Sequence, residues 1–467
     1  MKIELKDPIF FKLQSVAKKL NTPIFVIGGF VRDLFLKRES KDIDIVVVGD
    51  GIEFAHAFAE LIPEKTDFAV FKNFGTAMVK TKQWEIEFVG ARKESYSKES
   101  RKPAVIPGTI KDDQLRRDFT INALAISLNE GNLFELVDPF GGVIDIENKV
   151  IKTPLEPSIT FDDDPLRMMR AIRFAAQLNF AIEYNTFEAI KKQASRISIV
   201  SMERITEELN KIMQSKKPSI GLNLLFDSGL LAHVFPELQA MHGIEVIKKK
   251  AHKDNFYHTL QVVDNVCLET NNLWLRWATM LHDIGKPSTK KFLDAEGWTF
   301  HGHEDRGSRM VSKIFRRMKL PLNEKMKYVE KLVAMHHRPK ALAEDGITDS
   351  AIRRLIVDAG EDLEDLFTLC RADMTSRFPE KIKYYRANLL KVQELVKEVE
   401  ERDALRNWQP PISGEEIMAH FNLTPCREVG LIKLELREAI LEGDIPNTKE
   451  AAFQKMIEIG TRVLERG

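Results

Sequence analysis

The chain has 467 residues, which is too long for one ordinary domain, so roughly two to four domains are expected. Lysine plus arginine equal aspartate plus glutamate at 70 each, so a nucleic-acid surface would need its charge segregated onto one face. No apolar run reaches about eighteen residues, which predicts no membrane span. The three cysteines are scattered, which argues against a disulfide framework or thiolate metal site and favours a reducing cytoplasm.

The first 150 residues alternate between short runs that predict β-strands and stretches that predict helices. The strand-like runs are brief, rich in β-branched and aromatic residues, and bounded by Gly, Asp or Lys. They cover residues 24–29, 42–48, 77–81, 84–90, 123–128 and 134–138. From about Pro165 onward, strand signals almost vanish and apolar residues recur at helical spacing, as in 165–180 and 201–213. The sequence therefore predicts an α+β N-terminal domain followed by an all-helical remainder.

The segment GGFVRD, residues 28–33, follows an apolar run and opens a predicted helix. Paired glycines at a helix N-terminus let backbone N–H groups approach a phosphate, whose negative charge the helix dipole favours. Arg32, one turn along, could add a bidentate phosphate contact. A lone glycine pair such as Gly28 and Gly29 more often marks an ordinary strand–turn–helix corner, so this pattern gains weight only from its neighbours.

Two aspartates, Asp42 and Asp44, open the next strand-like run. Period-two alternation places both carboxylates on one face of the sheet, where like charges are costly unless a cation lies between them. Because hard oxygen ligands suit Mg²⁺, the pair predicts a catalytic magnesium site. Glu87 could add a third catalytic carboxylate from a neighbouring strand, although a solvated edge position explains it nearly as well.

Two arginine-rich segments, RRDFTINA at 116–123 and DDPLRMMRAIRF at 163–174, follow further along. In the second, Pro165 fits the first helical position, which makes Asp164 the predicted N-cap. The side chains that recur every third residue along one face of this helix are Asp164, Arg167, Arg170 and Arg173. A purely structural ladder of salt bridges would explain the same spacing.

Together these segments resemble the motif series of the bacterial tRNA nucleotidyltransferase and poly(A) polymerase family. The series covers roughly residues 20–215 and includes DPFGG at 138–142. Each motif alone is weak, but all of them in this order and spacing are very specific. The resemblance implies a head with a DNA-polymerase-β-like palm, followed by an all-α neck, body and tail. It implies template-independent addition of CMP and AMP from CTP and ATP to the 3′ end of tRNA.

The resemblance also implies roles for individual residues. It implies Asp42 and Asp44 as ligands of Mg²⁺. The residues expected to contact the nucleotide are Gly28, Gly29, Arg32, Arg117, Asp118, Asn122, Asp164, Arg167, Arg170 and Arg173. In one departure, Asp163 stands where the family's motif usually has glutamate, which puts in doubt a contact by Asp163 itself.

Nucleotide choice without a template requires protein groups that read the base. Cytosine and adenine both present an exocyclic amine beside a ring-nitrogen acceptor, so a carboxylate and a guanidinium match both bases. Uracil and guanine invert that pattern and would leave buried charged groups unpaired, at about 1–3 kcal/mol per group. Asp164 with Arg167 is such a pair, which predicts one pocket that accepts CTP and ATP.

A second constellation lies after residue 250, where most of the histidines fall. Imidazoles and carboxylates from several helices can converge on one or two divalent metals. The order H…HDIGKP…HxxxG…HH…D resembles the HD-domain metal phosphohydrolases, and implies Mn, Ni, Co or Fe as the metal. The implied ligands are His258, His282, Asp283, His303, one of His336 or His337, and Asp373. The family suggests 2′,3′-cyclic or terminal phosphates on RNA ends as substrates.

Four domains are therefore expected. They are a nucleotidyltransferase head at 1–150, a base-recognising neck and body at 151–250, an HD domain at 251–376 and a helical tail at 377–467. The tail is expected to bind tRNA, so the tRNA 3′ end and acceptor stem are the expected partners.

Three alternatives remain open. A poly(A) polymerase would share the head motifs, but the HD module and the lack of a long basic C-terminal tract count against it. An enzyme that adds only CC or only A is a second alternative. Segment 91–113 has the length and character of a mobile loop, which in the family is needed for the switch to ATP and so favours full CCA addition. A non-catalytic RNA-binding head is the third, and the Asp42–Asp44 pair argues against it.

Overall fold

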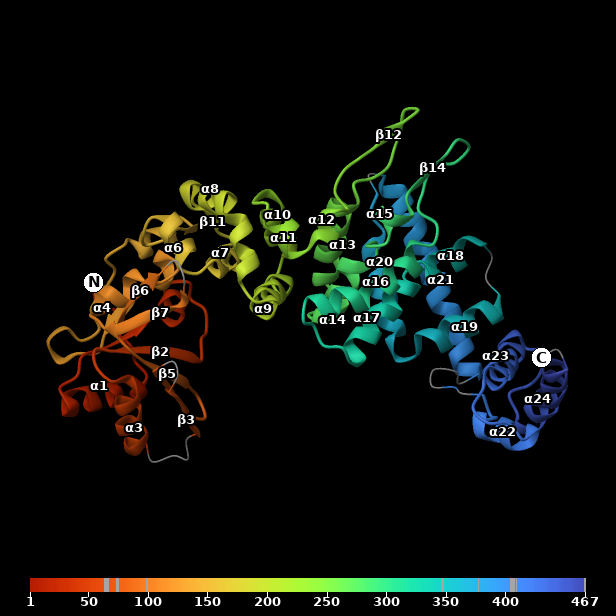
Figure 1. Cartoon of the computed structure of the whole chain (residues 1–467), viewed down its shortest axis with the longest axis horizontal. Coiled ribbons are helices and arrows are strands. Elements are labelled where there is room, and N and C mark those ends of the chain that lie inside the picture. The colour runs from red at the N-terminus through yellow and green to blue at the C-terminus, as the bar shows by residue number, and fades with distance from the viewer. Residues whose placement is uncertain are drawn as a thin grey trace. The chain divides into compact units, whose positions relative to one another are not determined.

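The computed structural model divides into two compact units, Met1–Gln239 and Ala240–Gly467 (Figure 1). Each unit is considered by itself. The residues that the structure describes are 1–62, 67–72, 75–97, 100–345, 348–376, 378–403, 408 and 410–465. In that part of the chain, no helix combines the length and the apolar character that crossing a membrane requires.

The first unit opens with a mixed seven-stranded sheet of order β3-β4-β5-β2-β1-β8-β9. Its strands are β1 Ile24–Ile27, β2 Asp42–Val47, β3 Asp67–Phe71, β4 Thr76–Lys80, β5 Glu85–Gly90, β8 Ala125–Ser127 and β9 Leu136–Val137. Strand β2 pairs antiparallel with β1 and parallel with β5. Every strand-like run expected in this part of the sequence forms a strand, and the α+β head is confirmed.

Three helices accompany the sheet: α1 Pro8–Leu20, α2 Gly29–Phe35 and α3 Gly51–Leu61. Helix α3 starts where the Asp50 carboxylate accepts the Ile52 and Glu53 backbone N–H groups at 2.8 and 3.1 Å. The rings of Phe54 and Phe58 then pack 5.7 and 5.4 Å from the ring of Phe88 on β5. Burying such side chains contributes about 1.5–3 kcal/mol each, so this contact fixes the helix to the strand that carries Glu87.

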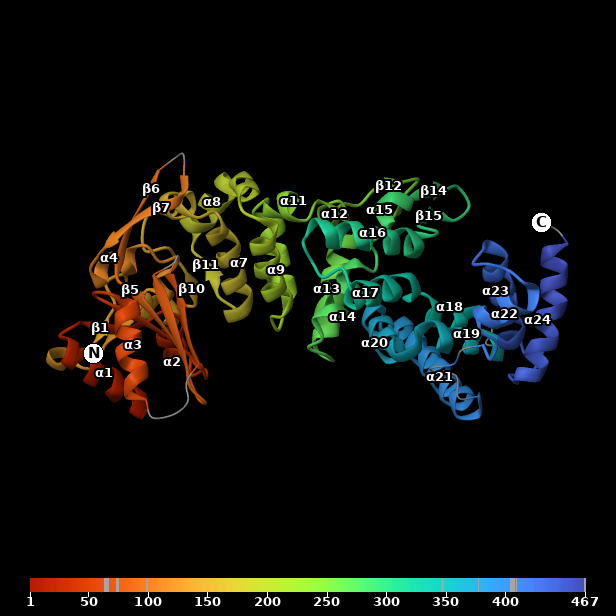
Figure 2. The ribbon, with the colours of Figure 1, turned by 60° about the horizontal axis from the view of Figure 1, so that its bottom comes forward.

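Segment 91–113 differs from its expected loop. It forms an antiparallel hairpin of β6 Arg92–Ser97 and β7 Ser100–Pro107, followed by helix α4 Ile110–Leu115 (Figure 2). Residues 98–99 lie outside the described part. The charged and small residues of this segment hide its strand pattern, but a capping box between Thr109 and Asp112 was a readable signal for α4.

The neck consists of short helices, of which α7, α9 and α10 pack against one another (Figure 1). The helices are α5 Gly142–Glu147, α6 Pro157–Asp163, α7 Leu166–Leu178, α8 Tyr184–Gln193, α9 Met202–Met213, α10 Pro218–Asp227, α11 Leu230–Val234 and α12 Pro236–Gln239. Helix α7 contacts both α9 and α10. The predicted N-cap is wrong by one residue: Pro165 is the N-cap of α7, which begins at Leu166, and the Asp164 carboxylate accepts the Leu166 N–H at 3.1 Å from the position before it. Short strands β10 Val150–Ile151 and β11 Ala181–Ile182 also pair here, which the expected all-helical remainder lacked.

The second unit is mainly helical, as expected. Its helices are α13 Asn255–Cys267, α14 Leu273–Leu281, α15 Lys286–Thr289, α16 His303–Arg317, α17 Glu324–Met335, α18 Arg338–Asp345, α19 Asp349–Ala359, α20 Leu363–Asp373, α21 Pro379–Asp403, α22 Gly414–Phe421, α23 Arg427–Glu442 and α24 Lys449–Leu464. Two small hairpins were not expected. They pair β12 Val246–Ile247 with β13 Lys250–Ala251, and β14 Lys291–Leu293 with β15 Gly297–Thr299. The buried Trp277 on α14 packs against Phe315 of α16 in the core.

A buried ion pair joins α7 to α9 in the neck. The Arg173 guanidinium donates to the Glu208 carboxylate, and their side chains are only 10% and 4% exposed. Arg173 also lies 3.9 Å from the centroid of the Phe174 ring and donates to Gln177. Arg173, expected to contact the nucleotide, is thus engaged in packing the neck.

We expect Glu208→Ala to lower the free energy of unfolding of the N-terminal unit by about 3–5 kcal/mol, because it leaves the Arg173 charge buried without its partner. Calorimetric unfolding of the full chain measures this. Glu203→Ala, at an exposed position of the same helix, is the matched control and should be nearly silent. Equal losses in both variants would contradict the structural role of the pair.

Candidate active sites

The three carboxylates expected at the first site lie on two neighbouring parallel strands. The register of β2 and β5 pairs Asp44 with Glu87, and Asp42 with Glu85. Asp44 is half-buried, whereas Asp42 and Glu87 are exposed. The structure therefore brings Asp42, Asp44 and Glu87 to one side of the sheet, as the alternation in the sequence predicts.

The electrostatics of these carboxylates fit a bound cation. Burial raises the pKa of Asp44, Asp42 adds to that rise, and Arg117 opposes it. The pKa of Glu87 is also raised, first by its partial burial and then by Asp44. Carboxylates that raise one another's pKa are stabilised by a shared positive charge, and oxygen donors of this kind suit a hard divalent ion.

Gly28 lies where the carboxylate face of the sheet meets the arginines. Its φ of +81° lies in the region that favours glycine. A Cβ atom here would lie 2.9 Å from Nη1 of Arg117 and 3.0 Å from Oδ2 of Asp44, so there is no space for one. At Gly29 a Cβ atom would meet Nη2 of Arg32 at an ordinary 3.6 Å. The glycine corner thus lets Arg117 and Asp44 approach the start of α2.

Asp113 holds the two arginines of the RRDFTINA segment. Its fully buried carboxylate accepts from Nε of Arg116 at 2.8 Å and from Nε of Arg117 at 3.1 Å. Asp113 was not expected at this site, although its spacing of three and four residues from the two arginines on a helical segment was a usable signal. Its effect is to fix the Arg117 guanidinium beside Gly28.

A chain of hydrogen bonds links most of the remaining expected nucleotide contacts. The Arg32 guanidinium donates to both carboxylate oxygens of Asp33 at 3.0 Å and to the side-chain oxygen of Asn122 at 2.8 Å. The Asn122 amide donates to Asp118 at 3.0 Å. Asp118 then accepts from Nε of Arg170 on α7 at 2.7 Å. Charge-assisted bonds of this kind are the stronger ones, so the chain ties the head to the neck.

The charge on Asp118 is maintained by its partners. Burial alone would raise the pKa of Asp118, but Arg170 and the amide of Asn122 outweigh it, and the pKa is lowered. The pKa of Arg170 is raised, chiefly by Asp118. Both groups therefore stay ionised, and the bond between them is a salt bridge at the head–neck junction.

Asp164 and Arg167, expected to read the base, are each held by other groups. Arg167 donates to the backbone carbonyls of Arg116 at 2.6 Å and Thr160 at 3.3 Å. The second carboxylate oxygen of Asp164 accepts from Nη2 of Arg204 on α9 at 2.9 Å. Arg204 was not anticipated from the sequence. The Arg167 side chain is thus held by carbonyls of both head and neck, and the Asp164 side chain by the neck.

The residues of the second constellation meet at the ends of several helices. Asp283 lies at the centre: its Oδ1 is 3.3 Å from Nε2 of His303 and 3.8 Å from Nε2 of His336, and its Oδ2 is 3.3 Å from Nε2 of His282. Asp373, at the end of α20, lies 2.8 Å from Nε2 of His258. The structure therefore brings this expected ligand set together.

Three of the imidazoles share one orientation. Nδ1 of His282, His303 and His336 lies 2.7–2.9 Å from the main-chain carbonyl three residues earlier. Nδ1–H is therefore the donor, and Nε2 turns a lone pair inward. Among the described residues, these Nε2 atoms and Oδ1 of Asp283 are buried without a hydrogen-bond partner. Such groups cost about 1–3 kcal/mol each unless satisfied, and a divalent metal would satisfy them together.

The pKa shifts agree with a cation at this position. Burial by itself lowers the pKa of His282, but Asp283 and Asp373 outweigh it and raise that pKa to about 10. Burial and the neighbouring imidazoles lower the pKa of His336 to about 3. The cluster thus attracts positive charge while keeping one imidazole neutral, as a metal ligand must be.

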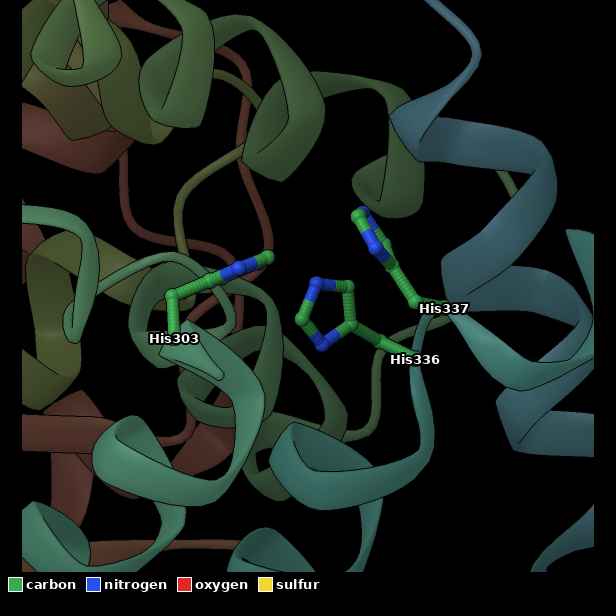
Figure 3. A group of neighbouring side chains, drawn as sticks. All are labelled: His303, His336 and His337. Atoms are coloured by element: carbon green, nitrogen blue, oxygen red, sulfur yellow. The ribbon is translucent and has the colours of Figure 1, made fainter. Parts of the chain in front are cut away.

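His336 and His337 are distinguished by their surroundings. Figure 3 shows the His336 ring between those of His303 and His337, at centroid distances of 5.3 and 4.5 Å. His336 is buried, whereas the His337 side chain is 38% exposed and its Nδ1 lies 2.9 Å from Glu304. Of the two histidines that the sequence left open, His336 is the one that faces Asp283.

His258 differs from the other imidazoles. Its Nδ1 lies 2.8 Å from Nζ of Lys253, which can only donate, so the ring hydrogen is placed on Nε2. That atom donates to Asp373 at 2.8 Å. In this arrangement His258 orients a carboxylate ligand and does not present a lone pair to the cluster.

Three family models match consecutive parts of the chain. "Poly A polymerase head domain" matches residues 24–152, "Probable RNA and SrmB-binding site of polymerase A" matches 179–241, and "HD domain" matches 255–377. Head and HD domains of these families imply a dependence on divalent metal ions.

Solved structures share this fold. The complex of a CCA-adding enzyme with ATP aligns with a TM-score of 0.63 at 23% identity, covering 97% of this chain and 96% of that one. A tRNA nucleotidyltransferase complexed with a primer tRNA and an incoming ATP analogue aligns with a TM-score of 0.57 at 25% identity, covering 82% and 99%.

Curated relatives extend the comparison. An A-adding tRNA nucleotidyltransferase of Deinococcus radiodurans is 33% identical over 74% of this chain and 79% of its own length. A multifunctional CCA protein of Aliivibrio salmonicida is 32% identical over 78% and 87%. With these identities over most of both chains, and with the head, RNA-binding and HD models in the same order, the chain belongs to the tRNA nucleotidyltransferase and poly(A) polymerase family and is a nucleotidyltransferase.

Proposed function

We propose that the head and neck complete the CCA end of tRNA by adding CMP and AMP from CTP and ATP without a template. The observation that carries the proposal is the register of Asp44 with Glu87 beside Gly28, where Arg117 also approaches. The relatives named multifunctional CCA proteins support it. The tRNA 3′ end and acceptor stem are the proposed partners, and the cytoplasm is the proposed location.

The proposed residue roles follow from the geometry. Asp42 and Asp44 would hold Mg²⁺, which when bound aligns the 3′ hydroxyl with the α-phosphate and stabilises charge on the attacking and leaving oxygens. Glu87 supports that carboxylate face. Gly28, Gly29, Arg32 and Arg117 receive the phosphates, and Asp118 and Asn122 keep Arg32 and Arg170 in place. Arg173 braces the neck through Glu208.

The proposed domains are the head at 1–150, the neck and body at 151–250, the HD domain at 251–376 and a tRNA-binding tail at 377–467. Helices α8, α9 and α10, which lie within the RNA-binding model at 179–241, contact α6 and α7, and α7 carries Arg167 and Arg170; this supports a role of the neck in holding the substrate.

Addition of AMP alone is a second candidate. The Deinococcus radiodurans relative and an Aquifex aeolicus relative, 42% identical over 38% of this chain, are both named A-adding tRNA nucleotidyltransferases. The second match covers only 21% of its own protein. A poly(A) polymerase, which shares the head, has no support from the names of these relatives.

Three tRNA substrates separate the candidates: one that lacks CCA, one that ends in C and one that ends in CC. We expect the wild type to extend all three to the same mature end when CTP and ATP are both present. An A-adding enzyme would extend only the third and would need only ATP, whereas a poly(A) polymerase would add long tails. Product length on a sequencing gel is the measurement.

Asp44→Asn should abolish this extension, because it removes a charge that holds the metal, and it should leave tRNA affinity in a gel shift nearly unchanged. Glu85→Gln is the matched control, since it lies on the neighbouring strand but pairs with Lys80. Near-normal extension by Asp44→Asn would remove the proposed catalytic centre.

Base selection gives a further prediction. Asp164→Ala or Arg167→Ala should narrow the preference for CTP and ATP over UTP and GTP by about 10–100-fold, the equivalent of 1–3 kcal/mol for a lost base contact. Incorporation of all four nucleotides by each variant measures this. Arg196→Ala, which breaks a neighbouring neck pair with Asp162, is the control. Unchanged selectivity with lowered thermal stability would show that the pair only braces the neck.

We also propose that the HD domain is a metal-dependent phosphohydrolase that holds Mn, Ni, Co or Fe. His282, Asp283, His303, His336 and Asp373 would be the ligands, with His258 and His337 beside them. The proposed substrates are 2′,3′-cyclic phosphates. Their hydrolysis consumes one water, breaks the P–O bond to one ribose oxygen, which takes up a proton, and leaves a phosphomonoester.

His336→Ala should therefore lose metal at the HD site, because its Nε2 faces Asp283, while His337→Ala should retain most of it. Metal content after incubation with Mn²⁺ or Ni²⁺, measured by mass spectrometry in an Asp42→Ala/Asp44→Ala background, reports this site alone. Equal retention in both variants would contradict the assignment of His336.

A further inference from the structure

A pocket of about 70 Å³ opens onto the cluster of candidate metal ligands. The residues of its lining used below are His336, Asp373, Lys340, Ile382 and Tyr385. His336 and Asp373 belong to the cluster, so whatever enters the pocket reaches that cluster. The other three come from α18 and from α21, the first helix of the tail.

Lys340 places a positive charge at the pocket. It follows His336 by four residues, and its Nζ lies 5.0 Å from the centroid of the Tyr385 ring. A cation over an aromatic face is held there electrostatically. The pocket therefore combines metal ligands with a positioned ammonium group, a combination that suits a phosphate.

Aromatic side chains continue from the pocket along the start of α21. The Tyr384 ring lies 5.7 Å from that of Tyr385. Phe378 and Tyr384 are 63% and 60% exposed, so their rings are accessible from solvent. Nζ of Lys381 lies 5.4 Å from the Phe378 ring centroid. Exposed rings interleaved with lysines form the platform on which single-stranded nucleic acids stack their bases.

We propose that this surface, made of Phe378, Lys381, Tyr384, Tyr385 and Lys340, binds a single-stranded RNA 3′ end that carries a terminal phosphate. Lys340 positions the phosphate at the metal ligands, and the last bases stack on the rings of α21. Single strands fit because only unstacked bases expose their faces to side chains. The proposal rests on the phosphohydrolase function of the HD domain, whose substrate it specifies as an oligonucleotide end in preference to a free nucleotide.

Two substrates test the surface in the full chain with Mn²⁺: 2′,3′-cyclic AMP, and an oligoadenylate that ends in a 2′,3′-cyclic phosphate. The wild type should show the lower KM for the oligonucleotide. Phe378→Ala and Tyr384→Ala should each raise that KM about tenfold relative to the KM for the mononucleotide, because each removes a stacking contact. Lys340→Ala should raise KM with both substrates, and Lys340→Arg should keep both KM values near those of the wild type.

Leu390→Ala is the matched control, because Leu390 is 57% exposed on the same helix but is aliphatic. A KM ratio that stays at the wild-type value in Phe378→Ala and Tyr384→Ala would overturn the proposal, while the phosphohydrolase function would stand.

Crosslinking gives a readout independent of hydrolysis. An oligoribonucleotide with 4-thiouridine next to a 3′-terminal phosphate should crosslink to peptides that contain Phe378 or Tyr384, and less to the two alanine variants. Absence of hydrolysis by the wild type would contradict the phosphohydrolase function, and the crosslink would still decide the RNA surface. Crosslinks confined to other parts of the chain would overturn it.

Discussion

The salt bridge between Asp118 and Arg170 is the constraint on which the proposed nucleotidyltransferase site depends. Asp118 belongs to the head and Arg170 to helix α7 of the neck, and the two are joined at 2.7 Å. Through Asn122 the same carboxylate also fixes Arg32 at the glycine corner. Phosphate-binding and base-reading residues lie on different structural elements, so their mutual placement requires a rigid connection. A buried, fully bonded carboxylate provides it, because each of its partners would lose a charged hydrogen bond if the junction opened.

The HD cluster also places side chains from different helices close together, but main-chain carbonyls hold them there. Its candidate ligands come from separate helices, and the imidazoles of His282, His303 and His336 are each anchored by a carbonyl of the preceding turn. The anchor sets both the tautomer and the direction of the ring before any metal binds. Packing of the helices alone then determines the distances between ligands. Ile382 and Tyr385 of α21 line part of the pocket beside the cluster. The tail therefore contributes to the surroundings of the HD site as well as to its own core.

Much of this arrangement could be predicted from the sequence, and the reasons for success and failure are physical. Alternation placed Asp42 and Asp44 on one face, and the register with β5 confirms the predicted proximity of Glu87. Motif order indicated which histidines meet; of these, His282 and His336 directly follow a helix and His303 begins one. Arg204 was missed because its contact with Asp164 depends on tertiary packing, whereas Asp113 was missed although its spacing from Arg116 and Arg117 is a local signal. The hairpin at 92–107 was missed because charged residues obscure its alternation.

The close neighbours of Gly28 constrain which residue can stand at this position. Gly28 leaves no space for a side chain, since even a methyl group would clash with Arg117 and Asp44, which lie together at the glycine corner. Glycine has no side chain, so Gly28 makes no side-chain contact of its own. Its contribution is the short distance it permits between two other groups. A larger residue is therefore opposed twice at this position, by the positive φ of the backbone and by the volume that Arg117 and Asp44 occupy.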